Sequence, residues 1–374
     1  MFKKFTNGCV KLVQRFLPDA FVFCIILTIV VFIAAMPVAG MNPIEVANAW
    51  GSGVWGLLAF SMQMALVLVL GSALANAPAI KRIIVKLAGV PKKPAGAVAF
   101  VTIISAICCF INWGFGLIIG ALLAKEVAKK IKGLDYRLII AAAYSGFVIW
   151  HSGISGSIPL GMTALDVDGT VANTGGAVTE VVPTSQTIFS AWNLIMVVAV
   201  VVVVAIVNAK MHPDAKDVVS IDPKLLEDAP EAVETKAKKD RTPAEKLENS
   251  MILSYIVVVI GAVYLIYYFV NAGSILNALS LNIVNLIFLI LGIAFHKTPI
   301  GYVKAIMESA ESAGGIILQF PFYAGIMGIM TGTVTEGGPS LAGVISNFFV
   351  AISNDVTFPL FTFLSAGIVN FFVP

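Results

Sequence analysis

The stretch "CCFINWGFG", which ends at Gly116, carries side chains that can hold a small ligand by hydrogen bonds. The Asn112 amide and the Trp113 indole each supply N–H donors, and the indole also offers an apolar wall. Gly114 and Gly116 let a ligand come close to the backbone, where a helix start would add free N–H groups and a positive dipole end. We therefore predict a ligand site at Asn112, Trp113, Gly114 and Gly116.

A second candidate set lies in "YSGFVIWHSGISGSIPL", where Ser and Gly interrupt an apolar run. Its hydroxyl groups can donate to a ligand, but Ser in membrane helices also serves close packing, and both roles stay open. His151 can carry a coupling proton or contact an anion, or it can be a neutral imidazole bonded to a backbone carbonyl. The candidates of this run are Ser145, His151, Ser152, Ser155 and Ser157.

The composition is that of a membrane protein. Of the 374 residues, 59% are apolar and only 12% are charged, with a mean hydropathy of +0.95, whereas soluble domains carry about 25% charged residues. The apolar runs are continuous, which favours spanning helices over the alternating strands of a barrel. The sequence therefore predicts an all-α polytopic membrane protein. It has no phosphate-binding loop and no cluster of catalytic His and Asp, which argues against an ATP-driven pump and against an enzyme.

The placement of Lys and Arg predicts the topology, because these residues favour cytoplasmic loops. The N-terminal segment is basic, and the loop after the first predicted span, 20–38, contains neither residue. The second span, 54–75, returns to a basic cluster. We therefore place the N-terminus in the cytoplasm and expect the chain to cross the membrane several times.

The apolar run 95–124 has basic clusters on both sides, at Lys81–Lys93 and at Lys125–Arg137. The run must then enter and leave by the same face. Two halves of about fourteen residues each reach only ~21 Å, which is short of a hydrocarbon core of ~30 Å. We predict a re-entrant hairpin with "INWGFG" at its tip, since irregular backbone at that depth is tolerated only inside protein or beside a water-filled cavity.

The remaining predicted segments follow the same charge rule. A broken span, 138–160, leads outward, and a span at 187–209 returns to a charged cytoplasmic connector, 210–250, with a short helix near "TPAEKLENS". A linking span, 251–270, and a further span, 275–294, come next.

The chain also contains a weak internal repeat. An offset of about 259 residues pairs "GLLAFSMQMA" with "GIILQFPFYA", and nearly the same offset pairs "FVTIISAICCFINW" with "FPLFTFLSAGIVNF". This alignment places Asn112 on Asn370, which becomes the ligand candidate of a second hairpin. The predicted topology runs the first repeat, 1–209, and the second, 275–374, in opposite directions. We therefore predict an inverted-repeat secondary transporter that binds its substrate between broken helices.

The second repeat is predicted to be incomplete. The first copy ends near residue 209, so a full second copy would continue for about ninety residues beyond "VNFFVP". We expect the chain to be truncated at its C-terminus, within the second hairpin.

Several stretches resemble the bacterial short-chain fatty acid transporters, namely "LLAFSMQMAL", "CCFINWGFGL", "SGISGSIPL", "DVVSIDPKLL", "NLIFLILGIAFHKTP" and "LQFPFYAGI". Where members of that family often have "WGGG", this chain has "WHSG". The resemblance implies uptake of small monocarboxylates such as butyrate or acetoacetate across the bacterial inner membrane. It also implies a homodimer of inverted-repeat subunits, and it gives the predicted site residues a carboxylate to bind.

Two other functions stay open. A carrier for another small anion, such as a C4 dicarboxylate, would favour additional Arg or Lys in the site, and a passive anion channel would need a continuous polar lining. No Asp or Glu lies at the predicted midplane, but Na⁺ can be held by carbonyl and hydroxyl oxygens alone, so the coupling ion, Na⁺ or H⁺, is left undetermined. We expect no organic cofactor and no nucleic-acid partner; the bilayer is the other expected partner.

Overall fold

The computed structural model confirms the all-α class: throughout its described residues it contains helices and turns and no strand. The described residues are 8, 10, 12, 15–16, 18–156, 158–160, 167–174, 178–226, 241–276, 278–334 and 338–372.

The chain divides into two compact units. Unit 1 consists of Met1–Met64 and Gly314–Pro374, and unit 2 consists of Ala65–Ala313. Helix α4 (Leu58–Ala75) belongs partly to each. The units do not follow the predicted repeats, because unit 1 combines helices from both of them.

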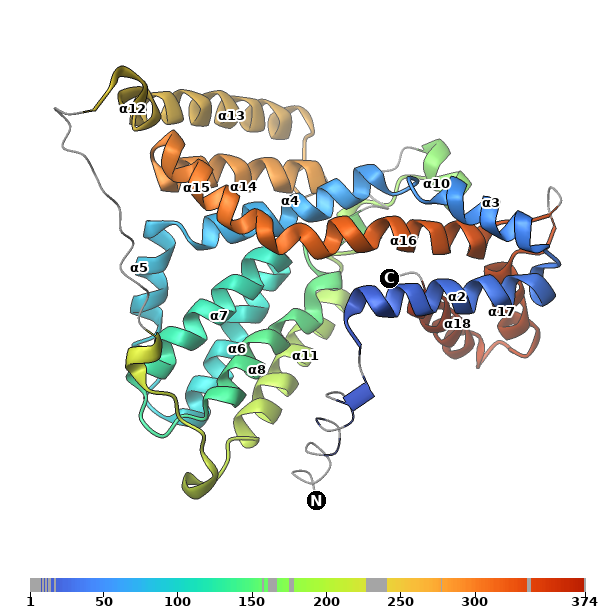
Figure 1. The fold of residues 1–374 in the computed structure, drawn as a ribbon, viewed down its shortest axis with the longest axis horizontal. Helices are drawn as coiled ribbons and strands as arrows, with labels where there is room; N and C mark the ends of the chain where they lie inside the picture. The colour runs from blue at the N-terminus through green and yellow to red at the C-terminus, as the bar shows by residue number, and fades with distance from the viewer. Residues whose placement is uncertain are drawn as a thin grey trace. The chain divides into compact units, whose positions relative to one another are not determined.

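Unit 1 packs α16 (Gly314–Thr331) against α2 (Ala20–Ala39) and α3 (Pro43–Gly53), with α17 (Leu341–Ala351) and α18 (Phe358–Phe372) as a further contacting pair (Figure 1). Small residues let α16 approach α3 closely, since a Cβ on Gly325 would lie 2.5 Å from the Trp50 indole. Buried Val, Leu, Ile and Met side chains of α2, α3 and α16 form the core of this unit.

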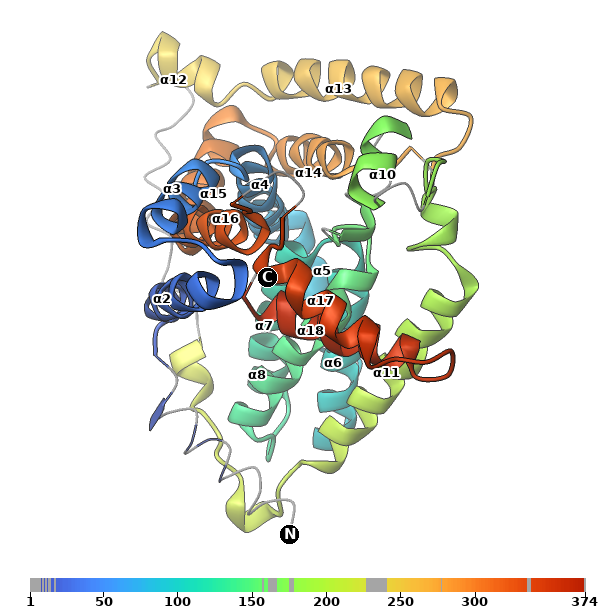
Figure 2. The same cartoon turned by 90° about the vertical axis from the view of Figure 1, so that its right-hand side faces the viewer.

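Unit 2 is built around a bundle of α6 (Pro94–Ile111), α7 (Trp113–Lys130), α8 (Tyr136–Ser145) and α11 (Ala191–Lys210), which lie side by side in both ribbon views (Figures 1 and 2). Its core consists of small and branched apolar side chains from α6, α7 and α8, together with α5 (Pro78–Leu87). Such side chains leave room for the helices to pack closely.

Helices α6 and α7 form an antiparallel hairpin. Gly116 on α7 faces Cys109 on α6 so closely that a Cβ there would collide with its backbone N and its Sγ. One turn further on, a Cβ on Gly120 would lie 2.7 Å from Ser105 Oγ. Because both pairs have the same midpoint, between Asn112 and Trp113, the arms run in opposite directions from the break at Asn112.

Asn112 alone separates the two arms. Its φ of −154° and ψ of 120° are those of extended backbone, so the helix cannot continue through it. Each arm has 18 residues, more than the predicted fourteen or so, because α7 extends through "KEVAKK". An arm of that length measures ~27 Å, still slightly less than a hydrocarbon core of ~30 Å. Entry and exit by one membrane face stays a prediction.

The predicted broken span does lose its helix at the Ser/Gly run. Helix α8 ends at Ser145, and the chain continues as the 3₁₀ segment η1 (Gly146–Ser152) and then as turns. Gly146 lies against α6, where a Cβ would be 2.6 Å from Ala106 N. The tighter segment thus lies directly on the hairpin.

Six segments of the described chain are long and apolar enough to cross a membrane: Ala20–Ala39, Leu58–Ala75, Pro94–Ile111, Ala191–Lys210, Met251–Asn271 and Pro299–Thr331. The last combines α15 (Pro299–Ala310), η6 (Glu311–Ala313) and α16. Helix α14 (Leu281–His296) starts six residues later than the predicted span at 275, because Ser280 caps it by accepting from Ile283 N. The short helix expected in the connector is α12 (Pro243–Glu248), which begins with a capping box.

The connector after α11 is fastened to the loop before α8 by Asp135. This buried carboxylate accepts from Leu138 N and Val219 N, both at 2.9 Å, and Tyr136 N donates to Val219 O. Burial alone would raise the pKa of Asp135, but these hydrogen bonds and the nearby Arg137 outweigh it and hold the pKa below the ordinary 3.8. The ionised form therefore stabilises the attached connector.

We expect Asp135→Ala to detach the connector, which hydrogen exchange at the Val219 amide would report as faster exchange. The folded pKa is lowered, so the stabilisation is complete at neutral pH and is lost as pH falls below 3.8 towards the folded pKa. Wild-type exchange should accelerate over that acidic range, while the variant should show no such transition. Asp214→Ala, which removes an exposed carboxylate of the same connector, is the control. Equal exchange in Asp135→Ala and wild type would contradict the assignment.

Cysteine labelling tests the predicted topology. Val90 lies in the loop between α5 and α6 and is 56% exposed, and Val181 lies before α11 and is 44% exposed. We expect Val90→Cys to react with a membrane-impermeant maleimide only from the cytoplasmic side and Val181→Cys only from outside. The unsubstituted chain measures the background from native cysteines. Labelling of Val90→Cys only from outside would overturn the topology.

Candidate functional site

The hairpin tip is held by Asn112, whose side chain is completely buried. Its backbone N–H donates to Cys108 O at 2.9 Å and so completes the last turn of α6. Its Oδ1 accepts from Phe115 N at 2.9 Å and so caps the first turn of α7. One residue therefore satisfies backbone groups on both arms, which is what a helix break away from water requires.

The turns after η1 cover the tip. Ser155, also fully buried, accepts from Trp113 N through its Oγ at 2.9 Å, and Ile154 N donates to Phe110 O at 2.7 Å. Gly153 lies directly against Phe110, where a Cβ would collide with the carbonyl oxygen. The two predicted candidate sets, at the tip and in the Ser/Gly run, are thus brought together.

Helix α4 crosses the other side of the tip. A Cβ on Gly71 would lie 2.5 Å from Phe115 N, and a Cβ on Gly114 would lie 2.6 Å from Leu68 Cα. The glycine at each position lets the two backbones touch. Gly114 therefore serves close packing with α4, and Gly116 serves the contact between the two arms.

Two of the backbone N–H groups that were expected to bind a ligand already donate to side chains. Trp113 N donates to Ser155 Oγ, and Phe115 N donates to Asn112 Oδ1. What remains is a pair of side-chain donors. Asn112 Nδ2 and Trp113 Nε1 are both buried and have no hydrogen-bond partner among the described residues. Each buried unpaired donor costs about 1–3 kcal/mol, so a ligand acceptor at this place would recover a large penalty.

An aromatic wall stands beside these donors. The Trp113 ring lies 5.9 Å from Phe147 and 6.0 Å from Trp150, and Phe147 and Trp150 are stacked at 5.4 Å with an interplanar angle of 4°. His151 continues the wall, with its ring centroid 3.7 Å from that of Trp150. An apolar wall next to N–H donors suits a ligand with one polar end and a short hydrocarbon tail.

His151 and Ser152 also line a cavity of about 300 Å³ that reaches α11. The cavity is mostly apolar, with Trp192 and Met196 among its walls. Thr187 Oγ1, which also lines it, is buried and has no partner among the described residues. The imidazole of His151 makes no hydrogen bond to any described residue, so the bonded imidazole that was one of its predicted roles is not seen there.

Ser145 has a structural role. Its Oγ donates to Ala142 O at 2.8 Å and accepts from Asn208 Nδ2 at 2.7 Å, and the same amide donates to Thr102 Oγ1 at 3.0 Å. This network ties α8, α11 and α6 together. Of the other candidates, Ser157 lies outside the described residues, and Asn370 lies in α18 of unit 1, where its side chain is not described.

Two asparagines on α11 were not predicted. Asn208 holds the network just described, and Asn193 Nδ2 donates to Ile188 O at 2.7 Å and to Ser152 O at 3.1 Å. The two bonds of Asn193 hold Ser152 and Ile188 in place, and all three residues line the 300 Å³ cavity. Two amides within the otherwise apolar "WNLIMVVAVVVVVAIVNAK" were the signal that could have found them.

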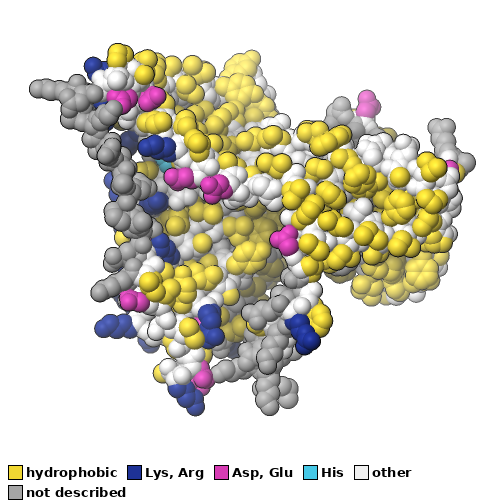
Figure 3. Space-filling view, in the orientation of Figure 1, with side chains coloured by type: hydrophobic (Ala, Val, Ile, Leu, Met, Phe, Trp, Pro, Cys, Tyr) yellow, Lys and Arg dark blue, Asp and Glu magenta, His cyan; other side chains and the backbone are white. Residues whose placement is uncertain are grey.

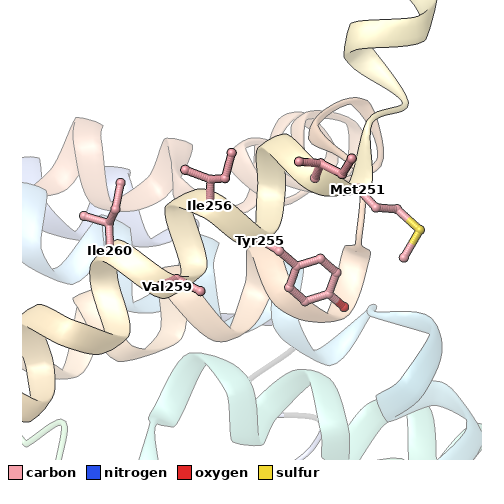
Figure 4. Close-up of a pocket in the computed structure, with 6 residues that line it drawn as sticks. Met251, Tyr255, Ile256, Val259 and Ile260 are labelled. Carbon is pink, nitrogen blue, oxygen red and sulfur yellow. The ribbon is translucent and has the colours of Figure 1, made fainter.

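A larger hollow on α13 (Met251–Asn271) is not a site of this kind. Figure 4 shows that Met251, Tyr255, Ile256, Val259 and Ile260 all project from that one helix, and nearly the whole helix is exposed. An apolar surface of a single exposed helix is what a lipid-facing span presents. Among the described residues, no group of three or more His, Cys, Asp or Glu side chains is placed to hold a metal ion.

Comparison with known proteins identifies the family. The family model described as "Short chain fatty acid transporter" matches residues 1–374. The chain belongs to this transporter family. A protein of Escherichia coli (strain K12), named as a candidate short-chain fatty acid transporter, is 40% identical over all of this chain and 81% of its own length. A protein of Haemophilus influenzae with the same name is also 40% identical, over all of this chain and 82% of its own length. No solved structure matches the chain.

Membership confirms the predicted resemblance and the class of function. The protein is a membrane transporter of the short-chain fatty acid family and not an enzyme. The geometry described above therefore belongs to a transporter whose family name implies a small carboxylate ligand, which is an acceptor for N–H donors.

Substitution of Gly116 tests the hairpin of this transporter. Gly116→Ala should force α6 and α7 apart and lower the free energy of unfolding by about 1–3 kcal/mol, the usual cost of overpacking. Gly96→Ala, on the same hairpin, is the control because no atom lies within 4 Å of its added Cβ. Thermal unfolding of the purified transporter in detergent measures both. Equal midpoints for the two variants would contradict the close contact with Cys109.

Proposed function

We propose that this protein is a secondary transporter that takes up short-chain monocarboxylates, such as butyrate or acetoacetate, across the bacterial inner membrane. The observation that carries the proposal is the pair of buried, unpaired N–H donors on Asn112 and Trp113. They lie at a helix break, beside an aromatic wall, in a chain of the short-chain fatty acid transporter family.

A monocarboxylate fits these groups by its chemistry. Its two oxygens only accept hydrogen bonds, and Asn112 Nδ2 and Trp113 Nε1 only donate. Hydrogen bonds to a charged acceptor contribute about 1.5–3 kcal/mol each, more than neutral ones. None of the residues at the tip carries a positive charge, which favours an anion with one carboxylate over a C4 dicarboxylate.

The order of the helices supports the repeat on which alternating access would depend. Shifting α2 to α6 by the repeat offset of about 259 residues brings them within a few residues of α14 to α18, in the same order. Both series consist of a long helix, a shorter one, an 18-residue helix, another short one and a long one that ends at or near the matched asparagines. This agreement over five helices supports an internal repeat more strongly than the two matched stretches of sequence do.

The contacts within each unit support the repeat in a second way. In unit 1, α3 packs on α16 and α2 on α17. In unit 2, the repeat-related pairs are also in contact: α15 packs on the end of α4 through Tyr302, Ala305 and Ala73, and α14 contacts α5. Each contact between a helix of the first copy and a helix of the second copy thus has an equivalent contact in the other unit. Such equivalent contacts are expected when each unit contains helices of both copies of one motif. Opposite orientation of the copies, a re-entrant path for the hairpin, a cytoplasmic N-terminus and a homodimer belong to the proposal.

Uptake by vesicles tests the function and identifies the coupling ion. Proteoliposomes that contain the protein should accumulate ¹⁴C-butyrate above empty liposomes. A Na⁺ gradient and a pH gradient, applied separately, should show which ion drives uptake. Unlabelled succinate should not compete, whereas unlabelled acetoacetate should. If no monocarboxylate of two to six carbons is taken up, the proposal is wrong, and competition by succinate would favour the dicarboxylate alternative.

Variants of Asn112 should separate binding from folding. Asn112→Ala should lower butyrate uptake about 10- to 100-fold, the equivalent of one hydrogen bond to a charged acceptor. Asn112→Asp keeps an oxygen that can cap α7 but places a negative charge where the carboxylate would bind, so it should also abolish uptake while the protein stays folded.

Asn271→Ala is the matched control, because that exposed amide at the end of α13 only donates to Tyr267 O. Its uptake should equal that of the wild type. Wild-type uptake by both Asn112 variants would assign Asn112 to packing alone.

A further inference from the structure

A second polar cavity lies in unit 2, away from the hairpin tip. It has a volume of about 600 Å³ and is formed where α4 ends, α5 begins and α14 passes into α15. Its polar lining includes Asn76, Lys81, His296, Thr298, Lys304 and Glu308. Figure 3 shows Lys, His and acidic side chains gathered at this end of unit 2. None of these residues belongs to the candidate site for the transported carboxylate.

The side chains of the two lysines of this cavity have no partner among the described residues. The ammonium groups of Lys81 and Lys304 form neither an ion pair nor a hydrogen bond with any of them. Glu308 is the one acidic side chain of the lining, and it too forms no ion pair in the described part of the chain. Two lysines against one glutamate leave the lining with an excess of positive charge, which no described side chain neutralises through an ion pair.

Two helix starts add to this positive potential. Helix α5 begins at Pro78 on the cavity wall, and its cap residue, Ala77, has no side chain that could accept from the first-turn N–H groups. Helix α15 begins at Pro299, beside the lining residues Thr298 and Ile300; its cap residue, Thr298, accepts from Gly301 N at 3.3 Å, so α15 contributes mainly through its dipole. The positive ends of helix dipoles and the free N–H groups at a helix start both favour oxyanions.

The walls of the cavity are fixed by hydrogen bonds. His296 Nε2–H donates to Ala73 O at 2.8 Å, and Asn76 Nδ2 donates to Ser72 O at 3.1 Å. Lys297, between His296 and Thr298, has the positive φ of 67°, and Thr298 N donates to His296 O across it at 2.8 Å. This three-residue turn, rare for a residue other than glycine, directs His296 and the start of α15 to the same cavity.

We infer that this cavity is an oxyanion-binding site, which takes the phosphate of an anionic phospholipid or a free carboxylate or phosphate. Lys81 and Lys304 supply the charge, the start of α5 supplies backbone donors, and the start of α15 adds the positive end of its helix dipole. Basic hollows between membrane helices at the level of the headgroups hold lipid phosphates in this way. The negative charge of Glu308 repels a bound anion, so it lowers the affinity of the site for that anion.

Binding is tested by the thermal unfolding midpoint of the protein in nanodiscs, independently of transport. One arm compares phosphatidylcholine alone with phosphatidylcholine that contains phosphatidylglycerol. The other arm adds inorganic phosphate to nanodiscs of phosphatidylcholine alone. The arm that supplies the ligand should raise Tm by about 4 °C or more. A rise only with phosphatidylglycerol assigns a lipid phosphate, and a rise with inorganic phosphate assigns a free oxyanion.

Matched double variants show whether the cavity is responsible. Lys81→Gln with Lys304→Gln should abolish the rise in Tm, and the corresponding arginine pair should keep it. Lys86→Gln with Lys92→Gln, which removes two exposed lysines outside the cavity, should leave the rise unchanged. Glu308→Gln should increase the affinity several-fold, a gain that loss of folding cannot produce.

The inference is overturned by three results: no rise in Tm in either arm with the wild-type protein, an equal loss in the control pair, or an unchanged affinity in Glu308→Gln. Because the readout is a binding-dependent Tm, these results do not depend on whether the protein takes up butyrate.

Discussion

Unit 2 depends on the hydrogen bonds with which Asn112 closes a helix break inside a membrane protein. In hydrocarbon no water can satisfy the backbone groups that a break exposes, so the chain must supply partners for them. Asn112 N completes α6 at Cys108 O, and Asn112 Oδ1 starts α7 at Phe115 N. Ser155 Oγ takes the next donor, Trp113 N. Without these bonds the hairpin would have to continue as one long helix, and neither α4 nor the turns after η1 would have a tip to pack on.

The small residues around the tip follow from the same constraint. Partners can reach the broken backbone only if other segments come very close, and a close approach requires positions with little or no side chain. Gly71 on α4, Gly114 at the tip and Gly153 after η1 each lie where a Cβ would overlap a neighbouring backbone. Gly116 does the same between the two arms. The glycines therefore bring the elements together, and the polar side chains make the bonds.

The sequence predicted the parts of this arrangement that depend on local chemistry and on the membrane. Basic clusters on both sides of 95–124 and an asparagine at its middle were enough to place the turn. The length of the arms was underestimated, because apolar content ends at Ala124 whereas the helix continues through Lys125–Lys130. The roles of Asn193 and Asn208 could not be predicted, since their acceptors are on other helices and only packing brings them together. That unit 1 combines helices from both predicted repeats could not be predicted for the same reason.

The asparagines of unit 2 differ in whether their buried amide donors are paired. Asn193 is buried and Asn208 is half-buried, and Nδ2 of each donates to two acceptors, so neither leaves a donor unpaired. Asn112 is completely buried and its Nδ2 donates to no described residue, and the next residue, Trp113, leaves its indole N–H unpaired as well. Single unpaired groups occur elsewhere in the described chain, as at Trp50, but these two donors are adjacent in the sequence, at a helix start and beside an aromatic wall. Each costs about 1–3 kcal/mol while it is empty. In the proposed site, a bound carboxylate would accept from both donors and remove this cost, so the empty state is the less stable one and the free energy gained on binding comes from pairing these two groups.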